Sequence, residues 1–383
     1  MNRIAIITAT RAEYGLLTPL IKKVYNDNEL TLNLIVTGTH LSDQYGHTID
    51  DIYKDGFPIA HEISILEKDN TPQGVSLTMA NAIRGFAKCF HEDRPDMVVI
   101  LGDRTEMLGI VAAAMNERIP IAHIHGGEVT AGAVDDGVRH AITKMSFLHF
   151  TCTEVYRNRV IQLGENPSRV FNVGSLGTEN ILTQPILSFE KLRQQIPGLP
   201  DCKEKPYAMV TFHPVTLEEN SVERQVEELC NAMNIRNDIF FLITAANADA
   251  GGDRANELLI KYCEGHANGK FVHNLGMLRY LSAVKYAGFV LGNSSSGILE
   301  APVIGTPTVN IGNRQEGRLM PASVINCDTD CISILEGIEK VVCMEHKPTG
   351  LYGDGNTSAK IKEIMKQFLE SGTINLMKGF YDI

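Results

Sequence analysis

Short runs of β-branched and other apolar residues alternate along the chain with longer segments in which apolar residues recur at helical spacing. In the first half, the short runs predict strands at Ile4–Thr8, Leu32–Val36, Met97–Leu101, Ile119–His123, Leu148–Thr151 and Val170–Val173. The periodic segments predict helices at Leu16–Tyr25, Thr78–His91, Glu106–Glu117, Val138–Phe147 and Glu154–Leu163. Strands that alternate with helices in this way are typical of βα units around a mostly parallel sheet.

The pattern weakens between about Thr178 and Lys205, where Pro185, Pro197 and Pro200 interrupt it, so we expect a linker there. A second alternation predicts strands at Ala208–Thr211, Ile239–Thr244, Phe271–His273, Phe289–Leu291 and Thr308–Asn310. The helices predicted with them lie near Val222–Met233, Arg254–Cys263, Met277–Tyr286 and Gly297–Val303. The second half therefore repeats the architecture of the first.

This repetition gives an N-terminal domain over residues 1–180 and a C-terminal domain over residues 205–360. The length of 383 residues agrees, because a single core rarely keeps growing to that size. A last helix from Lys360 leads to an apolar tail at residues 380–383. In two-lobed folds such a helix often crosses back to the first lobe, and the sequence alone leaves that open for residues 361–383.

Composition and charge narrow the class of protein. Apolar residues make up 44% of the chain and charged residues 21%, which is ordinary for a globular protein. A formal net charge of −11 argues against nucleic-acid or anionic-membrane partners, which need a basic face. The eight scattered cysteines indicate reduced thiols, and no apolar run approaches the roughly 18 residues of a membrane span. We expect a soluble, cytoplasmic protein.

Polar side chains follow several predicted strands of the first half, where doubly wound sheets bind their ligands. Arg11 follows the first strand beside a helix N-terminus, which suits a phosphate group, although a surface arginine is an equally good explanation of that position. Asp103 and Arg104 follow the strand that ends at Leu101, and a structural ion pair is the simple alternative to a catalytic role there.

The next strand runs into His123, His125 and Glu128, and Asp135 and Asp136 come shortly afterwards. Such a collection of imidazoles and carboxylates suits general acid–base chemistry. His123, His125 and Asp103 also resemble a metal ligand set, but a His-x-His spacing is equally what a packed strand end produces. We therefore favour acid–base chemistry over metal binding.

In the second half, His213 follows a predicted strand directly, and a polar glycine-rich loop at residues 246–252 follows the next strand. The segment 291–301 ends a buried strand in Gly292 and then opens a helix with three serines. Free backbone N–H groups at such a turn can hold a diphosphate, and Glu300 can accept hydrogen bonds from a ribose. Serine capping alone does not require three serines between glycines. Residues 311–318 add arginines on the same side.

With these motifs together, the sequence resembles the UDP-N-acetylglucosamine 2-epimerase family over essentially its whole length. It is most similar to the hydrolysing branch, which feeds sialic and legionaminic acid synthesis. The motifs that carry the resemblance are Thr10-Arg11-Ala12-Glu13-Tyr14-Gly15, Gly102-Asp103-Arg104, His125-Gly126-Gly127-Glu128, Asp135-Asp136 with Arg139-His140, Phe212-His213-Pro214, Gly292-Asn293-Ser294-Ser295-Ser296-Gly297 and Gly312-Asn313-Arg314-Gln315.

The resemblance implies an α/β fold with two Rossmann-like domains in a glycosyltransferase B type arrangement with an interdomain cleft. It implies a UDP-sugar substrate, no metal or nicotinamide cofactor, and a homodimer or homotetramer. The residues that it maps to UDP contacts are Arg11, Arg104, His213, Asn247, Ser294, Ser295, Gly297, Glu300 and Arg314. The residues that it maps to the catalytic site are Asp103, His125, Glu128, Asp135 and His213.

The implied reaction converts UDP-N-acetylglucosamine and water to N-acetylmannosamine and UDP through a glycal. Many relatives have a glutamate where this chain has His125, so either His125 or Glu128 can carry that proton, and Asp136 can replace Asp135. The alternatives are a UDP-2,4-diacetamido-trideoxyglucose substrate, a non-hydrolysing epimerase, a glycosyltransferase, a UDP-sugar-binding regulator or a metallohydrolase.

Overall fold

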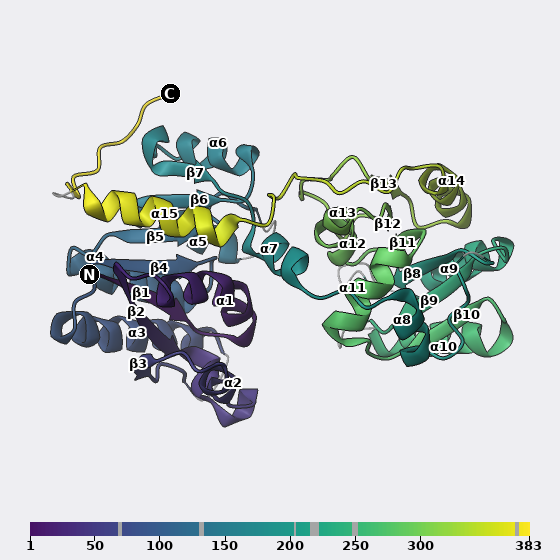
Figure 1. The fold of residues 1–383 in the computed structure, drawn as a ribbon, viewed down its shortest axis with the longest axis horizontal. Helices are drawn as coiled ribbons and strands as arrows, with labels where there is room; N and C mark the ends of the chain where they lie inside the picture. The colour runs from purple at the N-terminus through teal and green to yellow at the C-terminus, as the bar shows by residue number, and fades with distance from the viewer. Residues whose placement is uncertain (68–70, 130–133, 203, 215–221, 247–251, 372–374) are drawn as a thin grey trace. The chain divides into compact units, whose positions relative to one another are not determined.

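The computed structural model describes residues 1–67, 71–129, 134–202, 204–214, 222–246, 252–371 and 375–383. The chain divides into two compact units (Figure 1). Unit 1 comprises Met1–Asn180 and Gly353–Ile383, and unit 2 comprises Ile181–Tyr352. The C-terminal segment thus belongs to the same unit as the N-terminus.

Unit 1 is built on a seven-stranded parallel sheet with the order β3-β2-β1-β4-β5-β6-β7. Its strands are β1 (Asn2–Thr8), β2 (Leu30–Thr37), β3 (Ile59–Ile63), β4 (Met97–Leu101), β5 (Ile121–Ile124), β6 (Leu148–Thr151) and β7 (Val170–Asn172). The strands β1 and β4 are buried along most of their length on both faces, which explains their continuous apolar runs.

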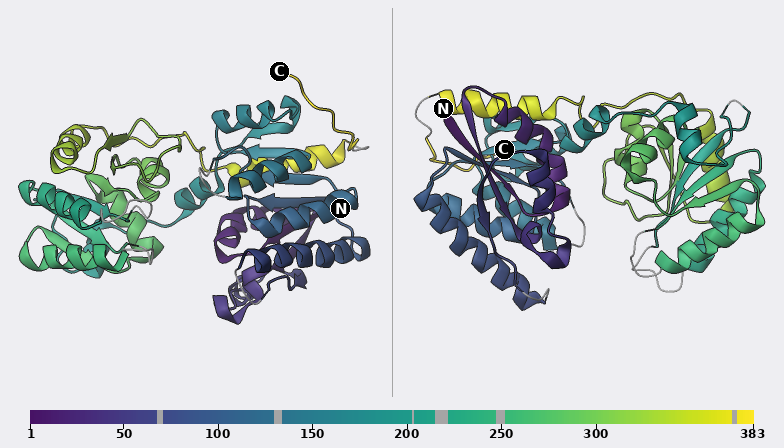
Figure 2. Two further views of the ribbon diagram at one scale, coloured as in Figure 1. Left: turned by 180° about the vertical axis from the view of Figure 1, so that it is seen from behind. Right: turned by 60° about the horizontal axis from the view of Figure 1, so that its bottom comes forward.

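Helices cover both faces of this sheet (Figure 2). They are α1 (Arg11–Tyr25), α2 (Ile49–Asp55), α3 (Pro72–Glu92), α4 (Thr105–Asn116), α5 (Val134–Met145), α6 (Glu154–Gln162), α7 (Leu176–Thr183) and α15 (Thr357–Glu370). Residues of α1, α2 and α15 share one core layer with the sheet, whereas α3, α4 and α5 share the other. The sheet of unit 1 therefore lies between two apolar layers.

The last helix, α15, is fastened to unit 1 by buried contacts as well as apolar packing (Figure 1). Ser358 donates from its backbone N–H and its hydroxyl to the carboxylate of Glu179, at 2.6 and 2.5 Å. Ile361 and Met365 are fully buried in the same core layer as α1. The structure thus gives residues 357–370 a place in unit 1, which the sequence left open.

Unit 2 has a six-stranded parallel sheet with the order β10-β9-β8-β11-β12-β13. Its strands are β8 (Tyr207–Thr211), β9 (Phe240–Thr244), β10 (Gly269–Val272), β11 (Phe289–Gly292), β12 (Thr308–Ile311) and β13 (Val324–Cys327). Its helices are α8 (Phe189–Gln195), α9 (Val222–Ile235), α10 (Gly252–Gly265), α11 (Gly276–Tyr286), α12 (Ser296–Leu299), α13 (Ala301–Ile304) and α14 (Cys331–Val342). If the strands of each unit are counted from its first strand, both sheets have the order 3-2-1-4-5-6, and unit 1 has a seventh strand after these.

The predicted α/β fold class, with two doubly wound halves, is confirmed. Two predictions about elements are wrong. The expected linker contains α7 and α8, and Leu192 of α8 is buried in the core of unit 2. The helix expected at Gly297–Val303 is two short helices, because Pro302, which has no N–H to donate, lies in the first turn of a second helix that begins at Ala301. Among the described residues, no helix is long and apolar enough to cross a membrane.

Candidate active site

The strand order of unit 1 reverses between β1 and β4, and this is where doubly wound sheets open a crevice for ligands. Arg11 is the exposed first residue of the helix after β1. Asp103 and Arg104 form the turn between β4 and α4. Parallel strands bring their carboxyl ends to one edge, so these three predicted site residues share the crevice edge of unit 1.

Glu13, for which no role was predicted from the sequence, is buried in the first turn of α1. Its Oε2 accepts from the N–H of Ala9 at 3.0 Å, and its own N–H donates to the hydroxyl of Thr10 at 3.2 Å, in the manner of a capping box. Burial raises the pKa of Glu13 to about 7, against the opposing charge of Arg104. A carboxyl group with a pKa raised to about 7 therefore lies in the first turn of α1, just after the end of β1.

Asp103 forms an ion pair with the guanidinium of Arg139, a residue on α5. The Arg139 side chain is almost completely buried, whereas that of Asp103 is partly exposed. Arg104 points its Nε at the carboxylate of Glu106, 2.6 Å away. The ion pair fixes the carboxylate of Asp103. Arg139 belongs to one of the motifs that carry the resemblance, but no role was predicted for it from the sequence.

His125 follows β5 in a left-handed backbone conformation with φ of 67°, which is uncommon for a residue other than glycine. Its N–H donates to the carbonyl of Phe150 at 2.9 Å, which fixes the turn. Its Nδ1 lies 3.6 Å from Oε1 of Glu128, and its Nε2 is buried without a hydrogen-bond partner among the described residues. The same Oε1 accepts from the thiol of Cys152 at 3.0 Å.

His123 does not share this environment. It is fully buried, and its Nε2 donates to the carbonyl of Gly102 at 2.7 Å while its Nδ1 lies 3.2 Å from the hydroxyl of Thr143. Burial lowers its pKa to about 3, so the ring stays neutral. The ligand set of His123, His125 and Asp103 considered for a metal is therefore wrong, because both ring nitrogens of His123 serve the packing of the sheet.

Asp135 and Asp136 lie in the first turn of α5, and residues 130–133 before them are outside the described residues. Asp135 is exposed. Asp136 lies 3.5 Å from Nε2 of His140, one helical turn later. Of the two carboxylates, Asp135 is thus the one that projects into solvent.

Unit 2 has the corresponding reversal between β8 and β11, where His213 and the serine segment follow the two strands. The side chain of Asn293 joins the two loops, because its Oδ1 accepts from the N–H of His213 and its Nδ2 donates to the carbonyl of His213, both at 2.7 Å. Asn293 is almost fully buried. Asn293 belongs to one of the sequence motifs, but no role was predicted for it from the sequence.

Gly292 allows the chain to turn at this point. Its φ is 138°, and a Cβ there would lie 2.0 Å from the carbonyl oxygen of Thr211 on the neighbouring strand. The next backbone N–H groups, of Ser294 and Ser295, donate no hydrogen bond within the described residues. They are available to an anion, although α12 is too short to contribute the helix dipole expected from the sequence.

Glu300 closes a buried chain of hydroxyl groups. The hydroxyl of Tyr280 donates to that of Ser296 at 2.6 Å, and the latter donates to Oε2 of Glu300 at 2.5 Å. Burial raises the pKa of Glu300 above its ordinary value. One carboxylate oxygen is thus used within the protein, and the other accepts no hydrogen bond from any residue that the structure describes.

The remaining predicted UDP contacts of unit 2 have different surroundings. Nη1 of Arg314 donates to the carbonyl of Asn293 at 3.2 Å, which brings this guanidinium beside the serine segment. A Cβ on Gly297 would lie 2.8 Å from a methyl group of Thr308, so packing against β12 explains this glycine. Asn247 is outside the described residues.

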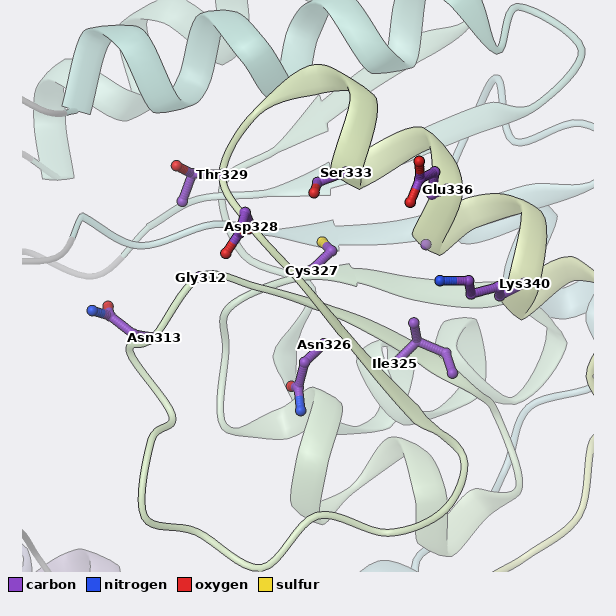
Figure 3. A pocket seen from close by; sticks show the side chains of 11 residues that line it. Gly312, Asn313, Ile325, Asn326, Cys327, Asp328, Thr329, Ser333, Glu336 and Lys340 are labelled. Atoms are coloured by element: carbon purple, nitrogen blue, oxygen red, sulfur yellow. The ribbon is translucent and has the colours of Figure 1, made fainter.

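A separate pocket of about 520 Å³ lies along the edge of unit 2, between β13 and α14 (Figure 3). Ser333, Glu336 and Lys340 line one side of it, and Asn313 lies at its end. None of the residues predicted to contact UDP is among its lining residues. The structure therefore gathers the predicted residues into two groups, one at the strand reversal of each unit.

Comparison with known proteins bears on what these two groups do. A family model described as UDP-N-acetylglucosamine 2-epimerase matches residues 22–366 of the chain. The protein belongs to the UDP-N-acetylglucosamine 2-epimerase family. This 2-epimerase is 39% identical over 347 residues to a Campylobacter jejuni protein named GDP/UDP-N,N'-diacetylbacillosamine 2-epimerase (hydrolyzing), over 90% of this chain and 89% of the relative. It is an enzyme of the hydrolysing type.

Two further relatives cover the epimerase almost completely. The Escherichia coli polysialic acid biosynthesis protein P7 is 36% identical over 389 residues, which is 100% of this chain and 98% of the relative. The Neisseria meningitidis UDP-GlcNAc 2-epimerase, solved with UDP-GlcNAc bound, has a TM-score of 0.76 and 17% identity over 96% of this chain and 100% of that chain. At that identity, the structural likeness concerns the fold.

Proposed function

We propose that the protein converts UDP-N-acetylglucosamine and water to N-acetylmannosamine and UDP, by elimination through 2-acetamidoglucal followed by hydration. The proposal rests on the different chemical groups found at the two strand reversals. One presents carboxylates and an imidazole beside Asp103, and the other presents free N–H groups and a guanidinium beside Asn293. Family membership supports the same reaction.

In the elimination, a base takes the proton from carbon 2, and the C–H electron pair forms the double bond to carbon 1. The bond from carbon 1 to the phosphate oxygen breaks, and UDP leaves with that electron pair. In the hydration, the oxygen of water adds to carbon 1 and loses one proton to a base, and a proton returns to carbon 2 with the opposite configuration. Three proton transfers and the stabilisation of a diphosphate are thus the tasks of the protein.

We assign the proton transfers to unit 1. Asp103 is held in one orientation by Arg139, and Asp135 is exposed at the start of α5, so both carboxylates are available as carriers. His125 is the third carrier. Its Nδ1 faces Glu128, which leaves Nε2 as the atom that exchanges a proton with the substrate. Glu128 then orients the imidazole.

We assign UDP to unit 2 with contributions from cations of unit 1. The N–H groups of Ser294 and Ser295, His213 and the guanidinium of Arg314 suit the diphosphate, and Glu300 suits the ribose. Arg11 and Arg104 are the cations of unit 1 that we assign to the leaving phosphate. Asn247 completes the proposed set, and Gly297 supports the segment by its packing rather than by contact with UDP.

A second substrate is favoured by a specific observation. The Campylobacter jejuni relative is named for a diacetylbacillosamine nucleotide, whose sugar has an acetamido group at carbon 4. The Escherichia coli relative, named for polysialic acid biosynthesis, favours N-acetylmannosamine as the product. The reaction at carbons 1 and 2 is the same for either sugar.

Incubation with each UDP-sugar separately, followed by NMR of the released sugar, decides between the two. Free N-acetylmannosamine from UDP-N-acetylglucosamine supports the first proposal. Turnover of the diacetamido sugar alone overturns it in favour of the second, and formation of an epimerised UDP-sugar without free sugar contradicts both.

A further inference from the structure

Three side chains with metal-binding atoms converge at the ends of β5 and β6 in unit 1. They are His125, Glu128 and Cys152, and one ligand atom of each lies within 4.8 Å of the others. Nδ1 of His125 is 3.6 Å from Oε1 of Glu128, and Sγ of Cys152 is 3.0 Å from that same oxygen. Nitrogen, oxygen and sulfur thus surround one point.

The spacing is close to what a tetrahedral ion requires. Zinc bonds of about 2.3 Å to sulfur and about 2.0–2.2 Å to nitrogen and oxygen place neighbouring ligand atoms about 3.4–3.6 Å apart. The nitrogen–oxygen distance already agrees, the sulfur–oxygen distance must open by about 0.6 Å, and the nitrogen–sulfur distance, which is at most 4.8 Å, must close by up to about 1.3 Å. Side-chain rotations have to supply these shifts, because the pairing of β5 with β6 holds the strands that the three residues follow.

The burial of the three residues gives the cluster an open and a closed side. The thiol of Cys152 is almost completely buried, whereas His125 and Glu128 are partly exposed, at 16% and 30% of their side-chain surface. An ion therefore reaches the cluster from the side of His125 and Glu128. A water molecule can occupy a fourth position there, as at zinc sites with three protein ligands.

The charges also favour a divalent ion. The thiol of Cys152 donates its proton to Oε1 of Glu128, so one proton lies between the sulfur and the carboxylate. A divalent ion replaces that proton, which leaves to solvent, and balances the thiolate and carboxylate together. Arg139, a cation in the surroundings of Cys152, is already paired with Asp103.

We propose that His125, Glu128 and Cys152 form a binding site for a thiophilic divalent ion such as Zn²⁺, and that the bound ion inhibits the enzyme. The mixture of imidazole, thiolate and carboxylate selects Zn²⁺ over Mg²⁺ or Ca²⁺. Inhibition follows because the ion occupies the imidazole and carboxylate to which we assign a proton transfer. This second part rests on the proposed function, whereas binding itself does not.

Binding is tested with Co²⁺, which reports thiolate coordination by a near-ultraviolet absorption band, and by Zn²⁺ competition with a chromophoric chelator. We expect one equivalent of Co²⁺ to give the band in the full chain. Cys152→Ala and the more conservative Cys152→Ser should both lose the band and bind Zn²⁺ at least tenfold more weakly. Cys89→Ala, which removes another buried thiol of unit 1, should change neither.

Inhibition is tested by UDP release at increasing Zn²⁺. The unsubstituted enzyme should lose activity and recover it in chelator, whereas Cys152→Ala, whatever its activity without zinc, should lose no further activity as Zn²⁺ rises. Absence of the thiolate band, or equal Zn²⁺ affinity in the Cys152 variants, overturns the site. A band without inhibition overturns the inhibitory role, and an enzyme that turns over no UDP-sugar contradicts the proposed function while leaving the Co²⁺ result valid.

Discussion

The carboxylate of Asp103 is held by a buried guanidinium and remains accessible at the crevice edge of unit 1. We predict that Asp103→Asn lowers kcat by about 10²–10⁴-fold, because the amide cannot exchange the proton. UDP affinity should change little, since UDP is assigned mainly to unit 2. Steady-state kinetics and UDP titration calorimetry measure the two quantities.

The matched control for that substitution is Asp201→Asn, which removes another carboxylate paired with an arginine, Arg193. Its kcat should stay close to that of the unsubstituted enzyme. An Asp103→Asn enzyme with undiminished kcat would remove Asp103 from the mechanism.

Glu13 is a buried carboxyl whose pKa burial raises to about 7. Its folded-state pKa exceeds its unfolded value, so its contribution to stability is fully present below about pH 4.5 and is lost as pH rises through about 7. The unsubstituted protein loses this contribution between about pH 4.5 and pH 7, whereas Glu13→Gln has none to lose. We predict that the unfolding free energy of Glu13→Gln, relative to that of the unsubstituted protein, rises by up to about 3 kcal/mol over this pH range. Urea unfolding at pH 5 and pH 8 measures the difference, and a difference independent of pH would contradict the prediction.

At the residue scale, the sequence indicated side chains that end strands, because that position depends only on the alternation of elements. It gave no role to Arg139, Asn293 or Cys152, whose importance comes from contacts with distant segments, or to Glu13, whose hydrogen bonds are local but buried. Asp103 and Arg139, for example, are 36 positions apart, so their ion pair leaves no local pattern in the sequence. Burial of polar groups against partners far along the chain has no local pattern.

Among the elements, the loops after β8 and β11 depend on one side chain for their spacing. Asn293→Ala removes both hydrogen bonds to the backbone of His213 and frees the two loops. We predict that the Kd for UDP rises roughly tenfold, equivalent to about 1.4 kcal/mol, while the far-ultraviolet circular dichroism is retained. Asn234→Ala, on the exposed face of α9, is the control and should bind UDP normally. Unchanged UDP affinity in Asn293→Ala would show that the hydrogen bonds between Asn293 and His213 do not position the site.

The elements that the sequence missed include β3 and β13, each at an edge of its sheet. Edge strands bury fewer residues, and β3 alternates partly buried with exposed positions around His61 and Glu62. The central strands are buried on both faces, so their apolar runs were evident. Prediction thus succeeded for the strands buried on both faces, whereas among the partly buried edge strands it found β7 and β10 but not β3 and β13.

At the scale of the whole molecule, unit 1 is discontinuous in sequence because α15 completes its core. Removing the chain after Tyr352 exposes apolar surface on α1 and the central strands. The loss of Ile361 and Met365 alone is worth roughly 3–6 kcal/mol, a large part of the stability of an ordinary domain. We predict that the thermal transition of unit 1 disappears from the calorimetric trace while that of unit 2 remains.

A chain that ends at Ser371 keeps α15 and serves as the control for this truncation. It loses the ion pair of Lys378 with Glu165, so its unit 1 transition should fall but persist. Loss of both transitions on removal of α15, or of neither, would contradict the assignment of α15 to the core of unit 1.

The central claim is that the carbon 2 proton is removed and replaced from solvent while UDP leaves carbon 1. The direct measurement is turnover of the UDP-sugar in deuterated water, with NMR and mass spectrometry of the free sugar. We predict that the free sugar carries one deuterium at carbon 2, that its configuration at carbon 2 is inverted, and that one equivalent of UDP is released with it. A free sugar that keeps its original hydrogen at carbon 2 would contradict elimination and hydration.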